Sequence, residues 1–204
     1  MRRCSMVPAD FFSDGKRALR KEMRRAVSVF VSENDADAVS AGICRRLVSS
    51  REFASADIVL SFVGGSLEIR TDVLNETALS SGKTLALPKV VGEGIMEFRV
   101  VSPTVPLSAQ LSSGAFGICE PVDGLPVLSF AGLSGKNVLV VVPGVAFGRD
   151  GTRCGHGKGF YDRYLSALAE KIPAARAVGL CLPCQVVESV PSSPLDVPVS
   201  GVFF

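Results

Sequence analysis

The chain has 204 residues, of which 47% are hydrophobic and 21% charged, and its 22 Lys and Arg against 20 Asp and Glu give a net charge of +2. A chain of this length can bury roughly 70% of its unfolded surface, so its core needs neither disulfides nor a metal. The small net charge argues against a protein whose main task is to coat nucleic acid. The longest apolar run, residues 138–147, is too short for a membrane span and is broken by Pro143 and Gly144.

Basic residues are concentrated at the start of the chain. Residues 1–25 hold eight Lys and Arg against three acidic residues, which leaves 14 basic and 17 acidic residues in the rest. The apolar residues of about 14–31 recur on one stripe, which predicts an amphipathic helix. Lys16 lies within this stripe and Arg20 at its edge, so both should face the protein body. The other cations of the helix are expected to point to the side or away: Arg17, Lys21, Arg24 and Arg25.

The following elements alternate between helical and extended patterns. A second helix is expected over about residues 33–50, with Ser32 or Asn34 as its N-cap. Later helices are expected over residues 71–81, with Thr71 as cap, and 160–171. Expected strands are residues 57–63, 84–90, 96–101, 136–142 and 175–181, with residues 136–142 in the centre and residues 102–126 rich in loops. This alternation is typical of βαβ units and predicts a parallel sheet with helices on both faces.

Six cysteines are scattered over the chain, and we expect them to be reduced. No apolar run of signal-peptide length follows Arg2 and Arg3, so a cytoplasmic location is expected. Cys181 and Cys184 form a C-x-x-C pair, which is either a redox pair or, as we favour in an apolar segment, two small core residues. His156 is the only histidine, which argues against a zinc site.

A glycine-rich loop over residues 143–159 separates the expected central strand from the helix at 160–171. Ligands of open α/β sheets bind at the carboxyl ends of strands, and a helix N-terminus favours an anion there. Basic and hydrogen-bonding side chains suited to phosphate occur in and just after the loop: Arg153, His156, Lys158 and Arg163. The pattern favours a phosphate cradle over a surface loop whose glycines only form turns. It matches neither a Walker A loop nor the Rossmann G-x-G-x-x-G spacing.

The segment PGVAF followed by D-G-x-R-x-G-x-G-x-G-[FY]-Y-D resembles the signature of the 5-formyltetrahydrofolate cyclo-ligase family, also called 5,10-methenyltetrahydrofolate synthetase. Four more segments resemble the family in order and spacing: KRALR at 16–20, LEIRT at 67–71, GKTLALPKV at 82–90 and GICEP at 117–121. The resemblance implies a single three-layer αβα domain over residues 1–204. Its largely parallel sheet should have the topology shared with sugar-phosphate isomerases and coenzyme A transferases, and residues 1–13 should form a loosely ordered extension.

The resemblance also implies a function. The family uses ATP and Mg²⁺ to convert 5-formyltetrahydrofolate to 5,10-methenyltetrahydrofolate, with release of ADP and phosphate. In that reaction the formyl oxygen is phosphorylated and N10 closes the ring. We therefore expect small-molecule substrates, no nucleic acid or membrane partner, and a monomer or weak dimer.

Residue roles follow from positions that match the family's motifs. The matching ATP-binding positions are Lys16, Arg20, Arg153, Gly155, His156, Gly157, Lys158, Gly159, Phe160 and Tyr161. The matching folate-binding positions are Arg20, Val63, Glu68, His156, Lys158 and Phe160. The matching metal ligands are Asp162 and Asp196. The chain departs from the family pattern at three positions: Gly148 in place of a common Asp, Phe160 in place of Tyr, and Ser200 in place of an acid.

Three other functions compete with this one. The first is a nucleic-acid-binding module built on the basic helix, which is disfavoured because the chain has two tyrosines, no tryptophan and an acidic remainder. The second is a catalytically silent protein that binds and stores 5-formyltetrahydrofolate. The third is a thiol switch at Cys181 and Cys184.

Overall fold

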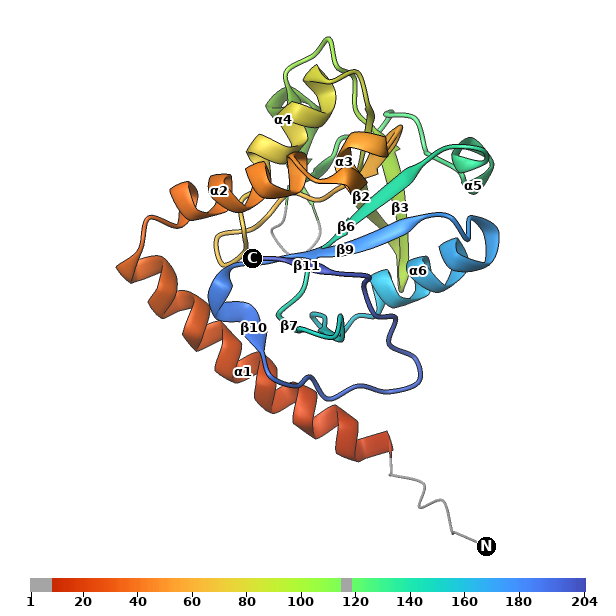
Figure 1. The fold of residues 1–204 in the computed structure, drawn as a ribbon. Coiled ribbons are helices and arrows are strands. Elements are labelled where there is room, and N and C mark those ends of the chain that lie inside the picture. The colour runs from red at the N-terminus through yellow and green to blue at the C-terminus, as the bar shows by residue number, and fades with distance from the viewer. Residues whose placement is uncertain (1–8, 115–118) are drawn as a thin grey trace, which may run out of the picture.

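A six-stranded sheet forms the centre of the computed structural model, which describes residues 9–114 and 119–204 (Figure 1). Its strands lie in the order β11 (Val202–Phe203), β9 (Arg176–Leu180), β6 (Val138–Val142), β1 (Ile58–Leu60), β2 (Thr84–Gly92) and β3 (Ile95–Val100). Every neighbouring pair is parallel except β2 and β3, which form an antiparallel hairpin. The predicted largely parallel sheet, with β6 in its interior, is therefore confirmed.

Helices cover both faces of this sheet. One face carries α2 (Ala36–Val48), α3 (Arg51–Ser55) and α4 (Asp72–Ser80), and the other carries α5 (Phe130–Leu133) and α6 (Phe160–Lys171). Val59 of β1 packs with the first group, whereas its neighbours Ile58 and Leu60 pack with the second, as the alternation of side chains along a strand requires. The expected αβα layering is confirmed.

Strand β1 is shorter than the expected 57–63. The chain leaves the sheet at Phe62, whose carbonyl oxygen accepts hydrogen bonds from the side chains of Thr71 and Asn75 instead of a strand partner. Thr71 does occupy the N-cap position of α4, but its hydroxyl is used in this way and does not cap the helix. The side chains of Thr71, which precedes α4, and of Asn75 within it thus fix the loop that leaves β1.

The first helix, α1 (Ala9–Glu33), begins before the expected start at 14. It includes residues 9–13 of the expected loose extension, whereas residues 1–8 lie outside the described part of the chain. The predicted N-cap of the second helix, Ser32 or Asn34, is wrong: Asp35 caps α2 and accepts from the Ala38 amide. Both predicted residues bond back into α1, since Ser32 donates to the Val29 carbonyl and Asn34 to the Phe30 carbonyl.

Short strands interrupt the two segments that were expected to be loops. Within residues 143–159, β7 (Ala146–Gly148) pairs with β8 (Arg153–Cys154), and β10 (Val186–Val187) joins β7 on its other side. Within residues 102–126 lie η1 (Leu107–Gln110), β4 (Leu111–Ser113) and β5 (Cys119–Pro121), and η3 (Pro183–Gln185) precedes β10. None of the helices in the described part of the chain combines the length and apolarity needed to cross a bilayer.

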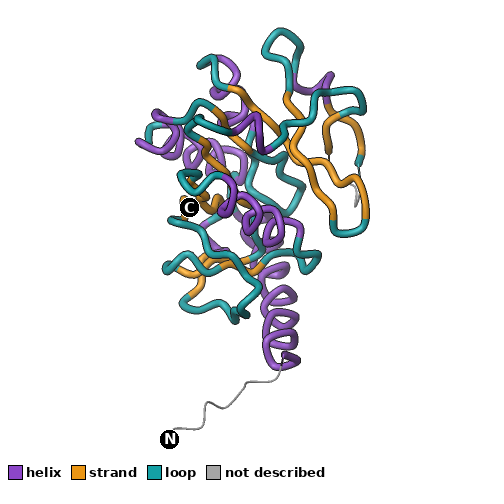
Figure 2. The backbone as a smooth tube through the Cα atoms, turned by 90° about the vertical axis from the view of Figure 1, so that its right-hand side faces the viewer, coloured by secondary structure: helices purple, strands orange, loops and turns teal. Residues whose placement is uncertain are grey.

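Helix α1 lies along the outside of the molecule beside this small second sheet, as Figures 1 and 2 both show. Met23 packs against Ala146, Cys154 and Val190, so the apolar stripe of α1 covers β7 and β8. This contact brings the start of the chain to the glycine-rich loop.

Candidate functional site

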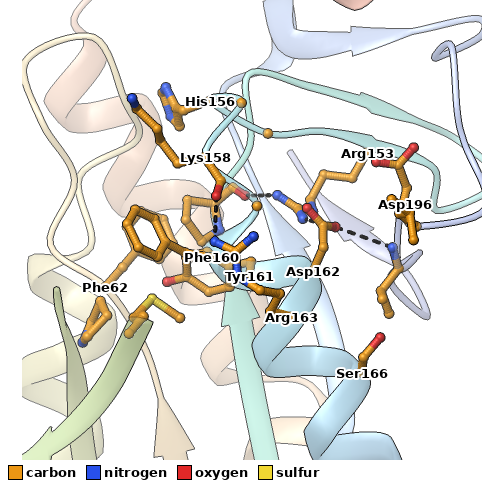
Figure 3. A pocket seen from close by; sticks show the side chains of 18 of the residues that line it. Phe62, Arg153, His156, Lys158, Phe160, Tyr161, Asp162, Arg163, Ser166 and Asp196 are labelled. Carbon is orange, nitrogen blue, oxygen red and sulfur yellow. Dashed lines mark hydrogen bonds and ion pairs between the residues drawn. The ribbon is translucent and has the colours of Figure 1, made fainter. Parts of the chain in front are cut away.

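A cavity of about 1080 Å³ opens where β1 and β6 end. Its walls come from α1, the loop after β1, the β2–β3 hairpin, the β4–β5 region, the glycine-rich loop with α6, and residues 193–197 (Figure 3). All fourteen residues assigned above from the family resemblance line it, from Lys16 to Asp196. Neither Gly148 nor Ser200, two of the departures from the family pattern, is among the lining residues.

Helix α1 supplies two cations to this cavity. The Lys16 side chain is only 12% exposed and forms an ion pair with Asp196. Arg20 Nε donates to the Gly155 carbonyl at 2.8 Å, which ties α1 to the glycine-rich loop. The remaining cations of the helix are exposed, as the helical pattern predicted: Arg17, Lys21, Arg24 and Arg25.

Arg153 is the most deeply buried cation of the site, with a side chain 4% exposed. Strand β8 places it beside the first turn of α6, where its Nη2 donates to Asp162 Oδ1 at 2.6 Å. Its guanidinium carbon lies 5.9 Å from the ring centroid of Tyr161. A buried guanidinium held by one carboxylate is rigid and correctly charged for binding phosphate.

Two buried donors on the cavity wall lack a hydrogen-bond partner among the described residues. They are Arg153 Nε and the Tyr161 hydroxyl. Burial raises the pKa of Tyr161, so its hydroxyl remains protonated. Because an unpaired buried donor costs free energy, these groups fit a ligand rich in acceptor oxygens.

The two candidate metal ligands both line the cavity and are linked through the backbone next to Asp196. Asp162 Oδ1 also accepts from the amide of Val197, the residue that follows Asp196. Burial acts to raise the pKa of Asp196, but hydrogen bonds from Lys16 and from the Ser193 amide and hydroxyl outweigh it and hold this pKa below its usual range. Asp196 therefore keeps a carboxylate at neutral pH, in contact with Lys16, and Asp162 is in contact with Arg153.

In the described part of the chain, no group of three or more His, Cys, Asp or Glu is arranged to hold a metal. A complete protein cage is therefore not formed by these residues. Mg²⁺ ordinarily takes only one or two carboxylates and fills its octahedron with phosphate oxygens and waters. Asp162 and Asp196 fit a magnesium ion that is shared with a phosphate ligand.

Glu68 and His156 join the loop after β1 to the glycine-rich loop. His156 Nε2 lies 2.9 Å from Glu68 Oε1, and the Gly65 amide donates to Oε2 at 2.9 Å. Burial acts to raise the pKa of Glu68, yet these two hydrogen bonds outweigh burial and lower it. Glu68 is thus an oriented, ionised acceptor in the cavity wall.

Glycines let the loop approach the helices on either side. Gly157 has φ +95°, and a Cβ there would lie 3.3 Å from the guanidinium carbon of Arg20. Gly159 has φ +67° and forms the N-cap of α6 without a capping side chain, and the first residues of α6 line the cavity. A helix N-terminus next to cations is chemically suited to an anion such as phosphate.

Several lining residues were not among the predicted site residues. Phe62, Pro88, Val90 and Met96 form an apolar wall, and Glu120 lies at its edge. The GICEP segment that resembles the family already contained Glu120. The lining residues Ser193, Pro194 and Leu195 directly precede the predicted metal ligand Asp196. No signal in the sequence indicated that the β2–β3 hairpin would face the glycine-rich loop.

The C-x-x-C pair lies outside the cavity lining. Cys181 is fully buried in the core between the sheet and α6, and burial raises its pKa to about 12. Burial also raises the pKa of Cys184. Protonated thiols are poor nucleophiles, so the geometry favours core residues over a redox pair.

The chain matches known proteins along most of its length. The model of the 5-formyltetrahydrofolate cyclo-ligase family matches residues 12–204. A probable 5-formyltetrahydrofolate cyclo-ligase of Caenorhabditis elegans is 29% identical over 191 residues, which cover 93% of this chain and 92% of that protein. The 5-formyltetrahydrofolate cyclo-ligase of Haemophilus influenzae is 30% identical over 193 residues, covering 92% and 96%.

A solved structure agrees with these relatives. The NMR structure of Aquifex aeolicus 5,10-methenyltetrahydrofolate synthetase superposes with a TM-score of 0.72 at 31% identity, covering 92% of this chain and 88% of that one. The matched region contains the glycine-rich loop, the cations of α1 and the cavity carboxylates of Asp162 and Asp196. The chain therefore belongs to the 5-formyltetrahydrofolate cyclo-ligase family.

Proposed function

We propose that this chain is an ATP- and Mg²⁺-dependent enzyme that converts 5-formyltetrahydrofolate to 5,10-methenyltetrahydrofolate. The observation that carries the proposal is the convergence, in one cavity, of Lys16, Arg20, Arg153 and Lys158 with the carboxylates of Asp162 and Asp196. Such a set suits the triphosphate of a nucleotide with its metal. The apolar wall beside it suits a flat heterocycle.

The reaction balances as two displacements. The formyl oxygen attacks the γ-phosphorus of ATP, the bond to the bridging oxygen breaks, and ADP leaves. N10 then attacks the activated carbon, the carbon–oxygen bond breaks, and phosphate leaves while the N10 proton passes to solvent. An amide oxygen is a poor leaving group until it is phosphorylated, so ATP supplies the driving force of ring closure.

The cations of the cavity serve the first displacement. Arg153 and Lys158 would hold the transferring phosphoryl group, and Lys16 and Arg20 the phosphates behind it. The amides at the start of α6 and the two unpartnered donors, Arg153 Nε and the Tyr161 hydroxyl, add neutral or charged hydrogen bonds. These groups are already fixed by packing and by α1, so little reorganisation is required when charge develops.

The ion pairs of the free protein give this site a specific binding behaviour. Lys16 is paired with Asp196, and Arg153 with Asp162. When MgATP binds, the phosphate oxygens would pair with Lys16 and Arg153. The metal ion would then pair with the carboxylates of both aspartates. Bound Mg²⁺ would neutralise the phosphate oxygens and polarise the γ-phosphoryl group. ATP without the metal is expected to bind more weakly, since both carboxylates would then repel it.

The folate is proposed to occupy the apolar side of the cavity. Phe160 and Val63 supply contact surface next to Glu68, whose oriented carboxylate accepts hydrogen bonds from the N–H groups of a reduced pterin. Arg20, His156 and Lys158 lie where both substrates would meet. The same proposal includes a cytoplasmic enzyme that acts on small molecules as a monomer or weak dimer.

The test is a spectroscopic assay with purified protein. Protein is mixed with 5-formyltetrahydrofolate, ATP and Mg²⁺, and the absorbance of the methenyl product is followed, with Lys158→Ala and Asp162→Ala beside the unaltered chain. We expect ATP-dependent product and a fall in kcat/KM of about 100-fold or more in each variant, the usual cost of removing one transition-state donor. Unfolding curves of the variants show whether they remain folded.

The opposite result has a definite meaning. Absence of product from the unaltered chain, with folate binding retained in a titration, would replace the proposal with a silent folate-binding protein. Binding of RNA with a steep salt dependence would instead favour the nucleic-acid function of α1.

A further inference from the structure

Arg163 connects two walls of the cavity that are far apart in sequence. It lies in the first turn of α6, and its Nε donates to the Gly94 carbonyl at 2.9 Å, in the turn between β2 and β3. Its Nη2 donates to the Lys158 carbonyl at 2.6 Å, in the glycine-rich loop (Figure 3). The guanidinium carbon also lies 5.7 Å from the ring centroid of Phe160.

These two carbonyls belong to two different segments of the cavity wall. The β2–β3 hairpin contributes Val90 and Met96 to the apolar wall, and the loop contributes Lys158 to the cationic wall. The Arg163 side chain therefore bonds to both walls, next to the packing of Phe98 of β3 against Tyr164 of α6.

The backbone leaves room for this guanidinium. A Cβ on Gly94, which has φ +72°, would lie 3.0 Å from Arg163 Nη2. A Cβ on Gly159, which has φ +67°, would lie 2.7 Å from Nη1. Side chains at either position would displace the Arg163 guanidinium, so Gly94, which is one of its partners, and Gly159, which follows the other, both leave room for it.

Arginine is suited to this geometry because its planar group has five donors in fixed directions. Two of them can bond to two separate carbonyls while the plane stays next to an aromatic ring. A lysine has a single ammonium on a flexible stem and cannot hold both carbonyls in the same orientation.

We propose that Arg163 is a positioning residue that holds the β2–β3 turn against the glycine-rich loop and thereby fixes Lys158 toward the phosphates. The inference rests on the proposed function for the role of Lys158, whereas the contact itself does not. We call this contact between Arg163, Gly94 and Lys158 the hairpin–loop latch.

The first experiment is a double-mutant cycle in the methenyl assay. Arg163→Ala is expected to raise the KM for ATP about tenfold, with a smaller change in kcat, and Arg163→Lys is expected to restore little of this loss. In a Lys158→Ala background, Arg163→Ala should add less than about a twofold effect, because the residue it positions is gone. The matched control is Lys171→Ala, which should leave KM unchanged. Lys171 lies at the other end of α6, where its ammonium is 4.6 Å from the centroid of the Phe130 ring.

The second experiment tests the hairpin–loop latch without measuring catalysis. Amide hydrogen exchange is measured on the ligand-free chain, on Arg163→Ala and on Lys171→Ala. We expect faster exchange at residues 155–159 and 92–94 in Arg163→Ala alone. Unchanged exchange at these residues would overturn the hairpin–loop latch even if the enzyme is active. If the loss in the double variant equals the product of the losses in Arg163→Ala and Lys158→Ala, Arg163 does not act through Lys158. Faster exchange in a chain that makes no product would retain the latch and overturn only the proposed function.

Discussion

The centre of the sheet and the rim of the cavity are held together by different forces. All five residues of β6 are buried and apolar, and their contacts are with other core side chains. At the rim, the contacts between remote segments are ion pairs and charged hydrogen bonds, including Lys16 with Asp196 and Arg153 with Asp162. Burial of apolar side chains holds the strands in one arrangement. An ion pair at the rim, in contrast, can exchange one of its members for a charged group of a bound ligand. Stability and function should therefore respond to different substitutions.

The largest expected effect is on the sheet. Val140→Asp places a charge in the middle of β6, where no described group can pair with it, and should lower the free energy of unfolding by more than about 5 kcal/mol. Because a domain has only about 5 to 15 kcal/mol in total, the variant should be unfolded or insoluble. Lys136→Glu, just before the same strand and exposed, should change stability by less than about 0.5 kcal/mol. Urea unfolding distinguishes the two, and a folded Val140→Asp would contradict the comparison.

A smaller effect is expected from one cation of the rim. Lys16→Ala should weaken ATP binding by about 10- to 100-fold, the range for a charged hydrogen bond to phosphate. Arg17 is the next residue on α1, has a side chain 79% exposed and pairs only with Asp14 at 3.6 Å among the contacts of the described chain. Arg17→Ala should change the affinity less than twofold. Calorimetric titration with MgATP measures both affinities. Equal losses of affinity in Lys16→Ala and Arg17→Ala would mean that the inward orientation of Lys16 does not determine nucleotide binding.

The smallest effect concerns Glu68 and pH. A carboxyl group with a lowered pKa in the folded state stabilises the protein above its unfolded pKa of about 4.3, and this contribution disappears as the pH falls through the folded-state value. Glu68→Gln should therefore lower the free energy of unfolding by about 1 kcal/mol at pH 7. The difference between the two proteins should shrink below pH 4.3. The control is Glu76→Gln, at an exposed position of α4. If the difference in unfolding free energy between the unaltered chain and Glu68→Gln grows as the pH falls, the pKa of Glu68 is not lowered in the folded state.

The sequence predicted the strands and helices whose side chains repeat with a clear period. Val138–Val142 is an uninterrupted apolar run, and Phe160–Lys171 has one apolar stripe, so both were located to within a few residues. Strands β7 and β8 contain three and two residues, too few to show a period, and were read as loop. The α2 cap was wrong because Ser32, Asn34 and Asp35 are all capping residues, and only the bend of the backbone decides which one caps.

The site was predictable where its residues are close in sequence. The glycines and cations of residues 151–159 indicated a phosphate site, and the helical pattern of α1 indicated that Lys16 and Arg20 face inward. Contacts between remote segments were not predictable from local patterns, since Asp196 is 180 residues from Lys16 and Gly94 is 69 residues from Arg163. The resemblance to the family supplied the remaining positions, including Val63, Glu68 and Asp196, because it compares whole chains.

The Lys16–Asp196 pair joins residues that are 180 positions apart. During synthesis, α1 and the central strands leave the ribosome well before Asp196 is made, and domains form as their chain becomes available. A chain interrupted before residue 193 lacks the cavity wall of residues 193–197 and the edge strand β11. Such a fragment would leave Lys16 without its Asp196 partner and, under the proposed function, should bind MgATP more weakly. Under the proposed function, MgATP should therefore stabilise a chain that includes residues 193–197 more than a chain that stops before them.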